Sequence, residues 1–496
     1  MKKTTIKRLN FLIVLLLLAP TIYSQEINSG AVVIPAQSEI DKEVELTFNS
    51  ITARKTTGSV IIIDVQEELK KDQSSSIGEI INGKVPGVIG NYNTWGTGNA
   101  VLLVDGIRQW DFYLNTLNPM EIESIVILKD GVSKARYGAQ GDAGVILITS
   151  KRGEAGTHQL RVFGQYSAAS SRALPKYLGA ADYMEKYNEA QLNDGIDPAS
   201  LRYSLEAIEG TRSGENPARY PDNDFYSGRY IKDNTTNASV FADVSGGSES
   251  ARYYVNTGWE QNSGWLNTPQ GDITDNLSFR GNLDVQFNEY LDMNVNTSAK
   301  VSFNEQPNAS SIWQTASTEF PNNYPVLWNP GLITNTEVQD FVLSVANLED
   351  GQVLGGNSSF LDNVYGNLTQ NGNRRDMQRD LQIGAKINLD MKFITEGLSA
   401  SMYGGMHFFN TLRTQQNPSF AVYEPVFDEG GQIDSVIVHG KDEAANRYNT
   451  NSDNSDFFRH ISYYGTLNYD RSFGEHDFSA VALMYADLFT LKDILQ

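Results

Sequence analysis

Cysteine is absent from this chain of 496 residues. Its absence excludes disulfide bridges, thiolate nucleophiles, cysteine-ligated zinc, iron–sulfur clusters and the acylated cysteine of a bacterial lipoprotein. Histidine is scarce as well, because the chain has only five and none falls into an HxH or HExxH spacing. We therefore expect neither a metal site nor another cofactor.

Positive charge is also in short supply. Lys and Arg together number 39 against 60 Asp and Glu, which gives a net charge of −21 and a pI of about 4.7. A chain that holds nucleic acid by neutralising phosphates needs clustered Lys and Arg, and no long basic run is present. Nucleic acid is therefore not an expected partner.

Catalytic motifs are missing too. No G-x-S-x-G elbow occurs, and nothing singles out two carboxylates as an acid and base pair, so we expect no enzyme. The run from Gly78 to Lys84 fits the start of a P-loop. However, Val85 stands where Ser or Thr must bind Mg²⁺, and Pro86 disrupts the helix that should cradle phosphate, so nucleotide binding is not expected.

One long apolar run is present, at the N-terminus. Lys2, Lys3, Lys7 and Arg8 precede the apolar segment from Phe11 to Ala19, a pattern typical of a secretory signal peptide. We expect cleavage after Ser24. The alternative is a membrane anchor, but nine apolar residues fall short of the roughly 20 that span a bilayer. No later apolar run reaches 18 residues, which excludes a helical membrane protein.

Residues 51–153 predict a small mixed α/β unit. Ser76 and Glu79 have the spacing of a capping box at a helix start. Asn118 followed by Pro119 predicts a second, one-turn helix start. Asp130 can cap a third helix that stops at Tyr137-Gly138. Apolar runs predict strands at 101–104, 125–128 and 145–149.

From about His158 onward, apolar and polar residues alternate. Leu277, Phe279 and Leu283, for example, fall on one face of a strand, opposite polar neighbours. Nine such segments are expected, at about 158–170, 236–245, 251–263, 276–287, 290–303, 379–393, 398–409, 458–471 and 476–488. Most are longer than the strands of soluble sandwiches, and short turns alternate with long loops between them. Both features favour an outer-membrane barrel with a polar lumen over a soluble sandwich.

The residues of the mixed unit resemble the plug of the SusC/RagA-type TonB-linked outer-membrane receptors. The resemblance lies in short motifs that occur in order and at the family's spacings. Their main residues are Gly83, Gly87, Asp105, Gly106, Asn118, Pro119, Glu123, Lys129, Asp130, Tyr137, Gly138 and Gly144. It continues into the early strands, at Ser245 to Ser248, Arg280 to Asp284 and Leu467 to Tyr469. Together the matches cover nearly all of residues 44–488.

The resemblance implies an α+β plug followed by an antiparallel transmembrane β-barrel. The expected divisions are a signal peptide at 1–24, a periplasmic segment at 25–50, the plug at 51–153 and part of a barrel at 154–496. Nine strands are fewer than the 22 that the family leads us to expect. We therefore expect an incomplete chain: a fragment, one part of a split gene, or a truncated product.

The implied function is nutrient import across the outer membrane. A SusD-like lipoprotein would capture an oligosaccharide or a peptide, and an inner-membrane motor would pull the plug through TonB. Our candidate for the TonB-binding strand is Val44, Glu45, Leu46, Thr47 and Phe48, with an ordinary first plug strand as the alternative. Other hypotheses left open are a receptor for a metal chelate or cobalamin, a secreted β-rich enzyme, and an inactive gene product. Cargo identity and oligomeric state are not readable from the sequence.

Overall fold

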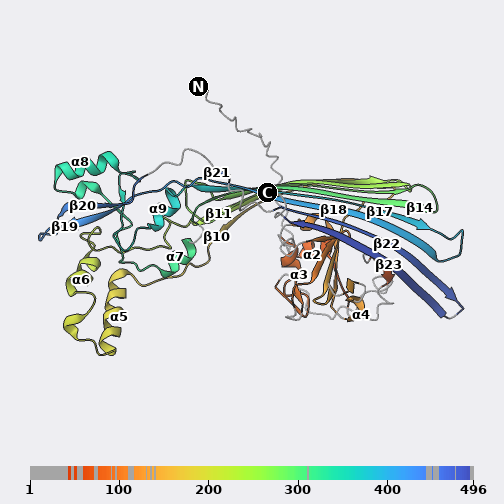
Figure 1. The fold of residues 1–496 in the computed structure, drawn as a ribbon, viewed down its shortest axis with the longest axis horizontal. Helices are drawn as coiled ribbons and strands as arrows, with labels where there is room; N and C mark the ends of the chain where they lie inside the picture. The colour runs from red at the N-terminus through yellow and green to blue at the C-terminus, as the bar shows by residue number, and fades with distance from the viewer. Residues whose placement is uncertain are drawn as a thin grey trace, which may run out of the picture.

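The computed structural model describes most of the chain from residue 43 onward. It covers residues 43–45, 50–52, 60–71, 76–90, 92–94, 98–109, 117–129, 131–134, 137–138, 141–309, 312–442, 449–450, 457–474 and 476–491. Two bodies stand out in Figure 1: a long curved sheet, and a compact mixed unit on the side toward which the sheet curves. We call them the wall and the plug.

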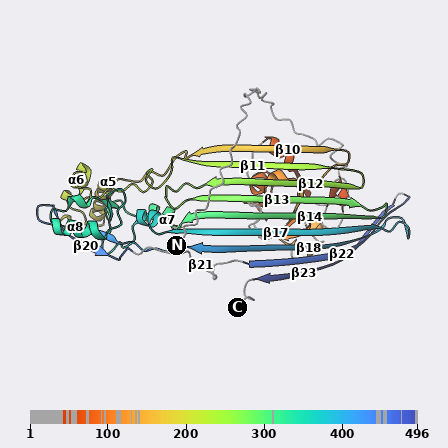
Figure 2. The same ribbon diagram turned by 90° about the horizontal axis from the view of Figure 1, so that it is seen from above.

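The wall contains nine long antiparallel strands in chain order. They are β10 (His158–Ser170), β11 (Asn234–Gly247), β12 (Ala251–Ser263), β13 (Ile273–Gln286), β14 (Leu291–Pro307), β17 (Asn373–Asp390), β18 (Leu398–Gln415), β22 (Phe457–Phe473) and β23 (His476–Leu491). The two-residue strand β21 (Asn449–Thr450) pairs with β18. The nine predicted strands are confirmed. In the described structure β10 and β23 end the strand order, so the sheet is open (Figure 2).

The alternation of the sequence becomes the two faces of the wall. On β13, Leu277, Phe279 and Leu283 are exposed, whereas Arg280 and Asn282 are buried. Successive side chains of a strand point to opposite faces, so the whole polar set turns toward the plug together. The expected polar lumen is therefore confirmed as the plug-facing side of the sheet.

The two ends of the wall differ in their connections. At one end the strands are joined by short turns. At the other end they are joined by residues 264–272 and by three long segments, residues 171–233, 308–372 and 416–456, which we call the long-loop unit (Figure 2). Its helices are α5 (Ala180–Asn193), η5 (Pro198–Ser200), α6 (Leu205–Ser213), α7 (Ile312–Thr318), η6 (Pro330–Leu332), α8 (Thr336–Val345) and α9 (Val364–Thr369). Its strands are β15 (Leu327–Trp328), β16 (Val353–Leu354), β19 (Val422–Phe427) and β20 (Ile433–His439).

The long-loop unit packs around cores of its own. One cluster joins Phe225 and Tyr230 of the first segment to Tyr324 and Leu368 of the second. The buried amide of Asn363 donates to the carbonyl oxygens of Val326 and Gly355, at 2.7 and 2.8 Å. The described residues of the long loops therefore form a packed body. None of the helices that the structure describes is long and apolar enough to cross a bilayer.

The plug is built on a five-stranded sheet in the order β3-β8-β9-β6-β7. The strands are β3 (Val60–Asp64), β8 (Ile122–Leu128), β9 (Val145–Ser150), β6 (Val101–Val104) and β7 (Ile107–Gln109). The other elements are α2 (Val65–Lys71), α3 (Ile77–Ile81), β4 (Val88–Ile89), β5 (Asn93–Thr94), η3 (Pro119–Glu121) and α4 (Gly131–Lys134). Fully buried residues such as Ile80, Ile125 and Ile146 fill its main core. The plug thus has a hydrophobic core independent of the wall.

The capping motifs read from the sequence form as expected. The Ser76 hydroxyl accepts a hydrogen bond from the Glu79 N–H at 3.3 Å at the start of α3. Asn118 caps η3 by accepting from the Met120 N–H at 2.9 Å. This helix lasts only one turn because β8 begins at Ile122, directly after it. Asp130, the proposed cap of the third helix, lies outside the described residues.

The segment before the plug forms a separate two-stranded sheet. Strand β1 (Glu43–Glu45) pairs with β2 (Ser50–Thr52) in antiparallel register. Val44 and Glu45 of the candidate TonB-binding strand lie in β1, whereas Leu46, Thr47 and Phe48 are outside the described residues. This hairpin is not part of the five-stranded sheet.

Candidate functional site: the contact between plug and wall

Arg280 of β13 reaches from the wall to two carboxylates of the plug. Its Nε donates to Glu121 at 2.8 Å and its Nη1 to Asp105 at 3.3 Å, and all three side chains are almost completely buried. A buried guanidinium is costly unless carboxylates neutralise it and accept its hydrogen bonds. Two carboxylates from different plug elements do so here.

The position of Asp105 follows from a tight turn. Asp105 and Gly106 connect β6 to β7, and both have positive φ angles, 47° and 85°. Asp-Gly is the sequence that best tolerates such a two-residue hairpin turn. The Asp105 carboxylate also accepts from the Ser150 N–H at 2.9 Å and from the Ser150 hydroxyl at 2.7 Å. Ser150 therefore holds the Asp105 carboxylate in place independently of Arg280.

A second wall residue, two positions along β13, continues the contact. The amide of Asn282 donates to the Ser150 hydroxyl and to the Lys151 carbonyl oxygen, both at 2.7 Å. The Lys151 side chain is itself buried. Burial, assisted by the nearby Arg161 charge, lowers the pKa of Lys151 to about 8. Asn282 therefore holds the end of β9 and the start of the connection to the wall.

Arg152 anchors the next residue of the connection. Its guanidinium pairs with Asp284 of β13 and donates to the Asn296 side-chain oxygen at 2.7 Å. One residue further, Gly153 lies directly against the wall backbone. A Cβ atom there would stand 2.3 Å from the Tyr253 carbonyl oxygen, so only glycine fits. The chain therefore leaves the plug along the plug-facing surface of the wall.

Strand β7 of the plug makes the same kind of contact with another wall strand. Gln109 of β7 donates to Gln382 of β17 at 2.9 Å, and Gln382 donates to Asp380 at 3.1 Å. Asp380 in turn lies 2.9 Å from the imidazole Nε2 of the buried His407. The plug is therefore hydrogen-bonded to β17 as well as to β13.

The apolar part of the contact is small. Tyr403 of β18 and Tyr464 of β22 stack with ring centroids 4.8 Å apart and pack against Ile107, just after the Asp105-Gly106 turn. A Cβ on Gly106 would come within 3.6 Å of the Tyr403 ring. The stacked rings of the two tyrosines therefore form a surface on which the turn lies, and we call this surface the tyrosine seat.

A polar cavity of about 330 Å³ lies between η3 and the wall strands nearest to it. Glu121, Arg280, Glu260 and Lys300 are among the residues that line it. Apolar side chains, among them Leu117 and Phe241, line the cavity as well, so charged groups of both signs and apolar groups meet at this boundary.

The family-motif residues divide into two groups. Asp105 and Gly106 meet the wall, and Tyr137 packs beside the tyrosine seat. The other described residues of the motifs belong to the plug itself. Lys129 donates to the Pro86 carbonyl oxygen at 2.6 Å, Asn118 and Pro119 begin η3, and Glu123 is an exposed residue of β8. Four glycines have positive φ angles: Gly83, Gly87, Gly138 and Gly144. Ser150 and Arg152 end the strand motif of the family resemblance, and Glu121 belongs to the helix start after Asn118, but the sequence did not predict that these residues contact the wall. The only feature of the sequence that could have indicated these contacts is that the residues are polar and lie at the ends of apolar strands. Polar residues at such positions are common in any protein.

The chain is similar to known proteins in sequence and in fold. The model of the TonB-dependent Receptor Plug Domain family matches residues 52–145. The TonB-dependent receptor P39 of Formosa agariphila is 23% identical over 416 residues, covering 79% of this chain and 37% of that protein. The TonB-dependent receptor SusC of Bacteroides thetaiotaomicron is 31% identical over 150 residues, covering 25% of this chain and 15% of that protein. A solved structure, the RagAB peptide importer in the open-open state, is similar with a TM-score of 0.60 and 16% identity, over 91% of this chain and 49% of that one.

A plug seated on the polar face of a long antiparallel wall defines the class of plug-and-barrel receptors. Within that class, the plug match and the local similarity to SusC support the resemblance to the TonB-dependent receptors of the SusC/RagA type, and RagAB has the same fold. The chain spans 37% of the length of the Formosa relative and about half the length of the RagAB chain.

Replacing Arg280 tests whether it holds the plug. Arg280→Met leaves two buried carboxylates without their cation, so we expect the plug to lose about 3–5 kcal/mol of stability. Pulse proteolysis of the purified protein across a urea series measures this loss.

The matched control is Arg375→Met. Arg375 pairs with Glu305 at 2.8 Å, but both side chains are substantially exposed, so its loss should cost only about 0–1 kcal/mol. Equal effects of the two substitutions would contradict a special role for Arg280.

Proposed function

We propose that this protein is a nutrient importer of the outer membrane, a SusC-type TonB-dependent transporter that takes up an oligosaccharide or a peptide with a SusD-like lipoprotein. The relatives support transport rather than catalysis, because they are TonB-dependent receptors and one similar structure is a peptide importer. In this proposal the short-turn end of the wall faces the periplasm and the long-loop unit faces the outside.

The polar character of the plug–wall contact carries the proposal. A plug that must move has to separate from the wall without exposing a large apolar surface. The contacts of Arg280, Asn282 and Gln109 are ion pairs and hydrogen bonds, which water can replace on both surfaces once they part. The hydrophobic core of the plug, by contrast, lies between its own elements. The interface is thus built to separate at lower cost than a core.

Force would enter through the segment before the plug. We propose that TonB adds a strand to the chain at Val44, Glu45, Leu46, Thr47 and Phe48, where backbone hydrogen bonds give strength under load. The pairing of β1 with β2 outside the main plug sheet supports this, because a two-stranded hairpin can accept or exchange a strand without disturbing the plug core. A cleaved signal peptide at residues 1–24, which lie outside the described structure, would deliver the protein to the periplasm.

Linking the plug to the wall should stop transport. Gln109→Cys and Gln382→Cys place two thiols at a contact where the native amides are 2.9 Å apart, in a chain without other cysteines. Dibromobimane, which joins two neighbouring thiols and then fluoresces, would bridge them in cells expressing the complete gene. We expect uptake of the growth-supporting cargo to fall to the level of a strain that lacks the gene.

Each single-cysteine variant, treated in the same way, is the control and should keep uptake within about twofold of the wild type. Normal uptake by a fully bridged protein would show that this plug contact need not open, and would overturn the proposed mechanism.

A proline in the candidate TonB strand should uncouple binding from uptake. Val44→Pro removes a backbone N–H and cannot pair within a strand, so we expect at least a tenfold loss of uptake with unchanged cargo binding at the cell surface. Val44→Ile, which keeps the backbone donor, should behave as the wild type. Unchanged uptake by Val44→Pro would place the coupling segment elsewhere.

A further inference from the structure

The long-loop unit carries a row of aromatic side chains at the edge of its cores: Tyr226 packs against one core, and the other members of the row are more exposed. Tyr177 and Tyr226 come from the segment between β10 and β11, whereas Trp313 and Phe320 come from α7 and the residues that follow it. Tyr177 is 60% exposed, Trp313 40% and Phe320 41%. Large aromatic groups at this level of exposure, gathered from two segments, mark a surface that contacts something else.

The geometry of the row leaves ring faces available. Tyr177 stacks on Tyr226 with centroids 5.5 Å apart and an interplanar angle of 25°, and Tyr226 in turn lies 6.4 Å from Trp313 at 45°. Phe320 stacks on Tyr183 at 5.0 Å. Tyr177, Trp313 and Phe320 remain partly exposed beside these neighbours, so part of each ring is accessible to a ligand.

The row is held in place before any ligand arrives. The Tyr226 hydroxyl lies 2.8 Å from the Ser317 hydroxyl of α7, and Ser317 donates to the Trp313 carbonyl oxygen at 2.7 Å. The Asn223 amide joins the two segments by donating to the carbonyl oxygens of Pro321 and Tyr324, at 3.0 and 2.8 Å. Little conformational entropy would therefore be lost on binding.

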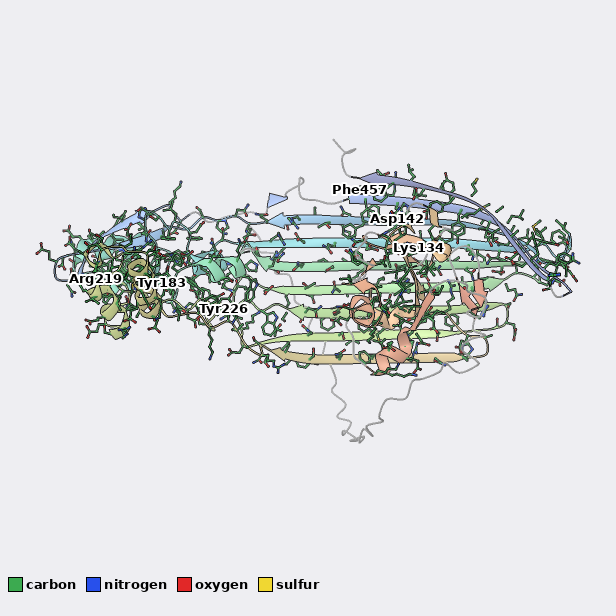
Figure 3. All side chains as sticks on the ribbon, turned by 90° about the horizontal axis from the view of Figure 1, so that it is seen from below. Lys134, Asp142, Tyr183, Arg219, Tyr226 and Phe457 are labelled. Carbon is green, nitrogen blue, oxygen red and sulfur yellow. The ribbon has the colours of Figure 1, made fainter. Side chains whose placement is uncertain are left out.

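The row also lies on the plug-facing side of the wall, which is the side along which a cargo would pass. Helices α5, α6 and α7 are on the same side of the sheet as the plug (Figure 1). Seen from that side, Tyr226 lies between the α5–α6 hairpin and the ends of the wall strands, and Tyr183 lies on the hairpin (Figure 3). A ligand on the row would be close to the mouth of the lumen.

The charge around the row restricts the kind of ligand. Residues 308–372, which supply Trp313 and Phe320, contain six Asp and Glu but no Lys or Arg. Residues 171–233 contain eleven Asp and Glu against eight Lys and Arg. Of these basic groups, Arg202 stacks on the rings of Tyr187 and Tyr203. A polyanion would be repelled by this acidic surface.

We propose that this aromatic row is a binding site for the uncharged sugar rings of an oligosaccharide. The proposal rests on the import function above and selects between its two cargo classes. The C–H face of a sugar ring carries partial positive charge and packs against the electron-rich face of an aromatic ring. Polar groups beside the rings, such as Ser317 and the exposed Asp224, can exchange hydrogen bonds with sugar hydroxyls.

A peptide fits this surface less well. Extended peptides are captured by adding a strand to an exposed sheet edge, and helical peptides by an apolar groove. The row offers ring faces carried by α7 and by loop residues instead of a strand edge. Ring stacking on such a platform recognises flat faces, which sugars present at every unit.

The test uses the purified product of the complete gene in detergent and an array of neutral, uronate-containing and sulfated oligosaccharides, with a peptide library beside it. We expect binding of a neutral oligosaccharide, weakened at least tenfold by Trp313→Ala and by Tyr177→Ala. Phe341→Ala removes an equally exposed aromatic ring on α8 of the same loop, outside the row, and should change affinity less than twofold.

Three results would overturn the assignment: binding of acidic glycans in preference to neutral ones, binding of peptides alone, or neutral-glycan binding that both row variants leave intact. Peptide binding with plug-dependent uptake would remove the sugar site but keep the importer. If neither class binds and uptake does not depend on the gene, both the site and the import function fail.

Discussion

The burial of one cation between plug and wall is the constraint on which the rest of the structure depends. Arg280 is almost completely removed from water, so it is tolerable only where Asp105 and Glu121 meet it together. That requirement fixes the turn after β6, the single turn of η3 and the register of β13 relative to the plug. A change at any of the three leaves a buried charge unpaired.

The same constraint explains how a plug can be firmly seated and still removable. Its polar contacts to the wall run through Arg280, Asn282, Arg152 and Gln109, and each of these side chains has at least one polar partner. The main core of the plug lies between its own elements, and Ile107 and Tyr137 pack against the two wall tyrosines. Separation therefore exchanges protein hydrogen bonds for water hydrogen bonds and leaves the plug core intact.

Much of this architecture could be predicted from the sequence, because a two-residue alternation has one structural meaning once it persists for a dozen residues. The prediction was least accurate at strand ends. Strand β17 begins at Asn373, six residues before the expected start. Its first residues are held by pairing with β18 and by the Arg413–Asp376 ion pair at 2.8 Å. Such polar contacts produce no hydrophobic repeat in the sequence, so the early start could not be predicted. It ends at Asp390 because the Asp390 carboxylate accepts from the Lys392 N–H and turns the chain.

The candidate site was predictable only in its parts. Asp105-Gly106 and Arg280 to Asp284 both belong to the motifs of the family resemblance, yet nothing in the sequence pairs two segments 175 residues apart. The long-loop helices were missed because their apolar residues pack against other loops, without the repeat of a helix on a single core. Tyr226 and Trp313 are an example, since only the folded chain brings them within 6.4 Å.

The central claim is that the plug can separate from the wall because the contacts between them are mainly polar. Hydrogen exchange of the intact protein, followed by mass spectrometry, tests this claim most directly. The account predicts that amides of β6, β8 and β9 exchange together, through an opening of lower free energy than the one that exposes β12 to β14, and that Arg280→Met accelerates only the plug amides. Exchange of plug and wall strands with a single common time course, shifted equally by the substitution, would contradict it.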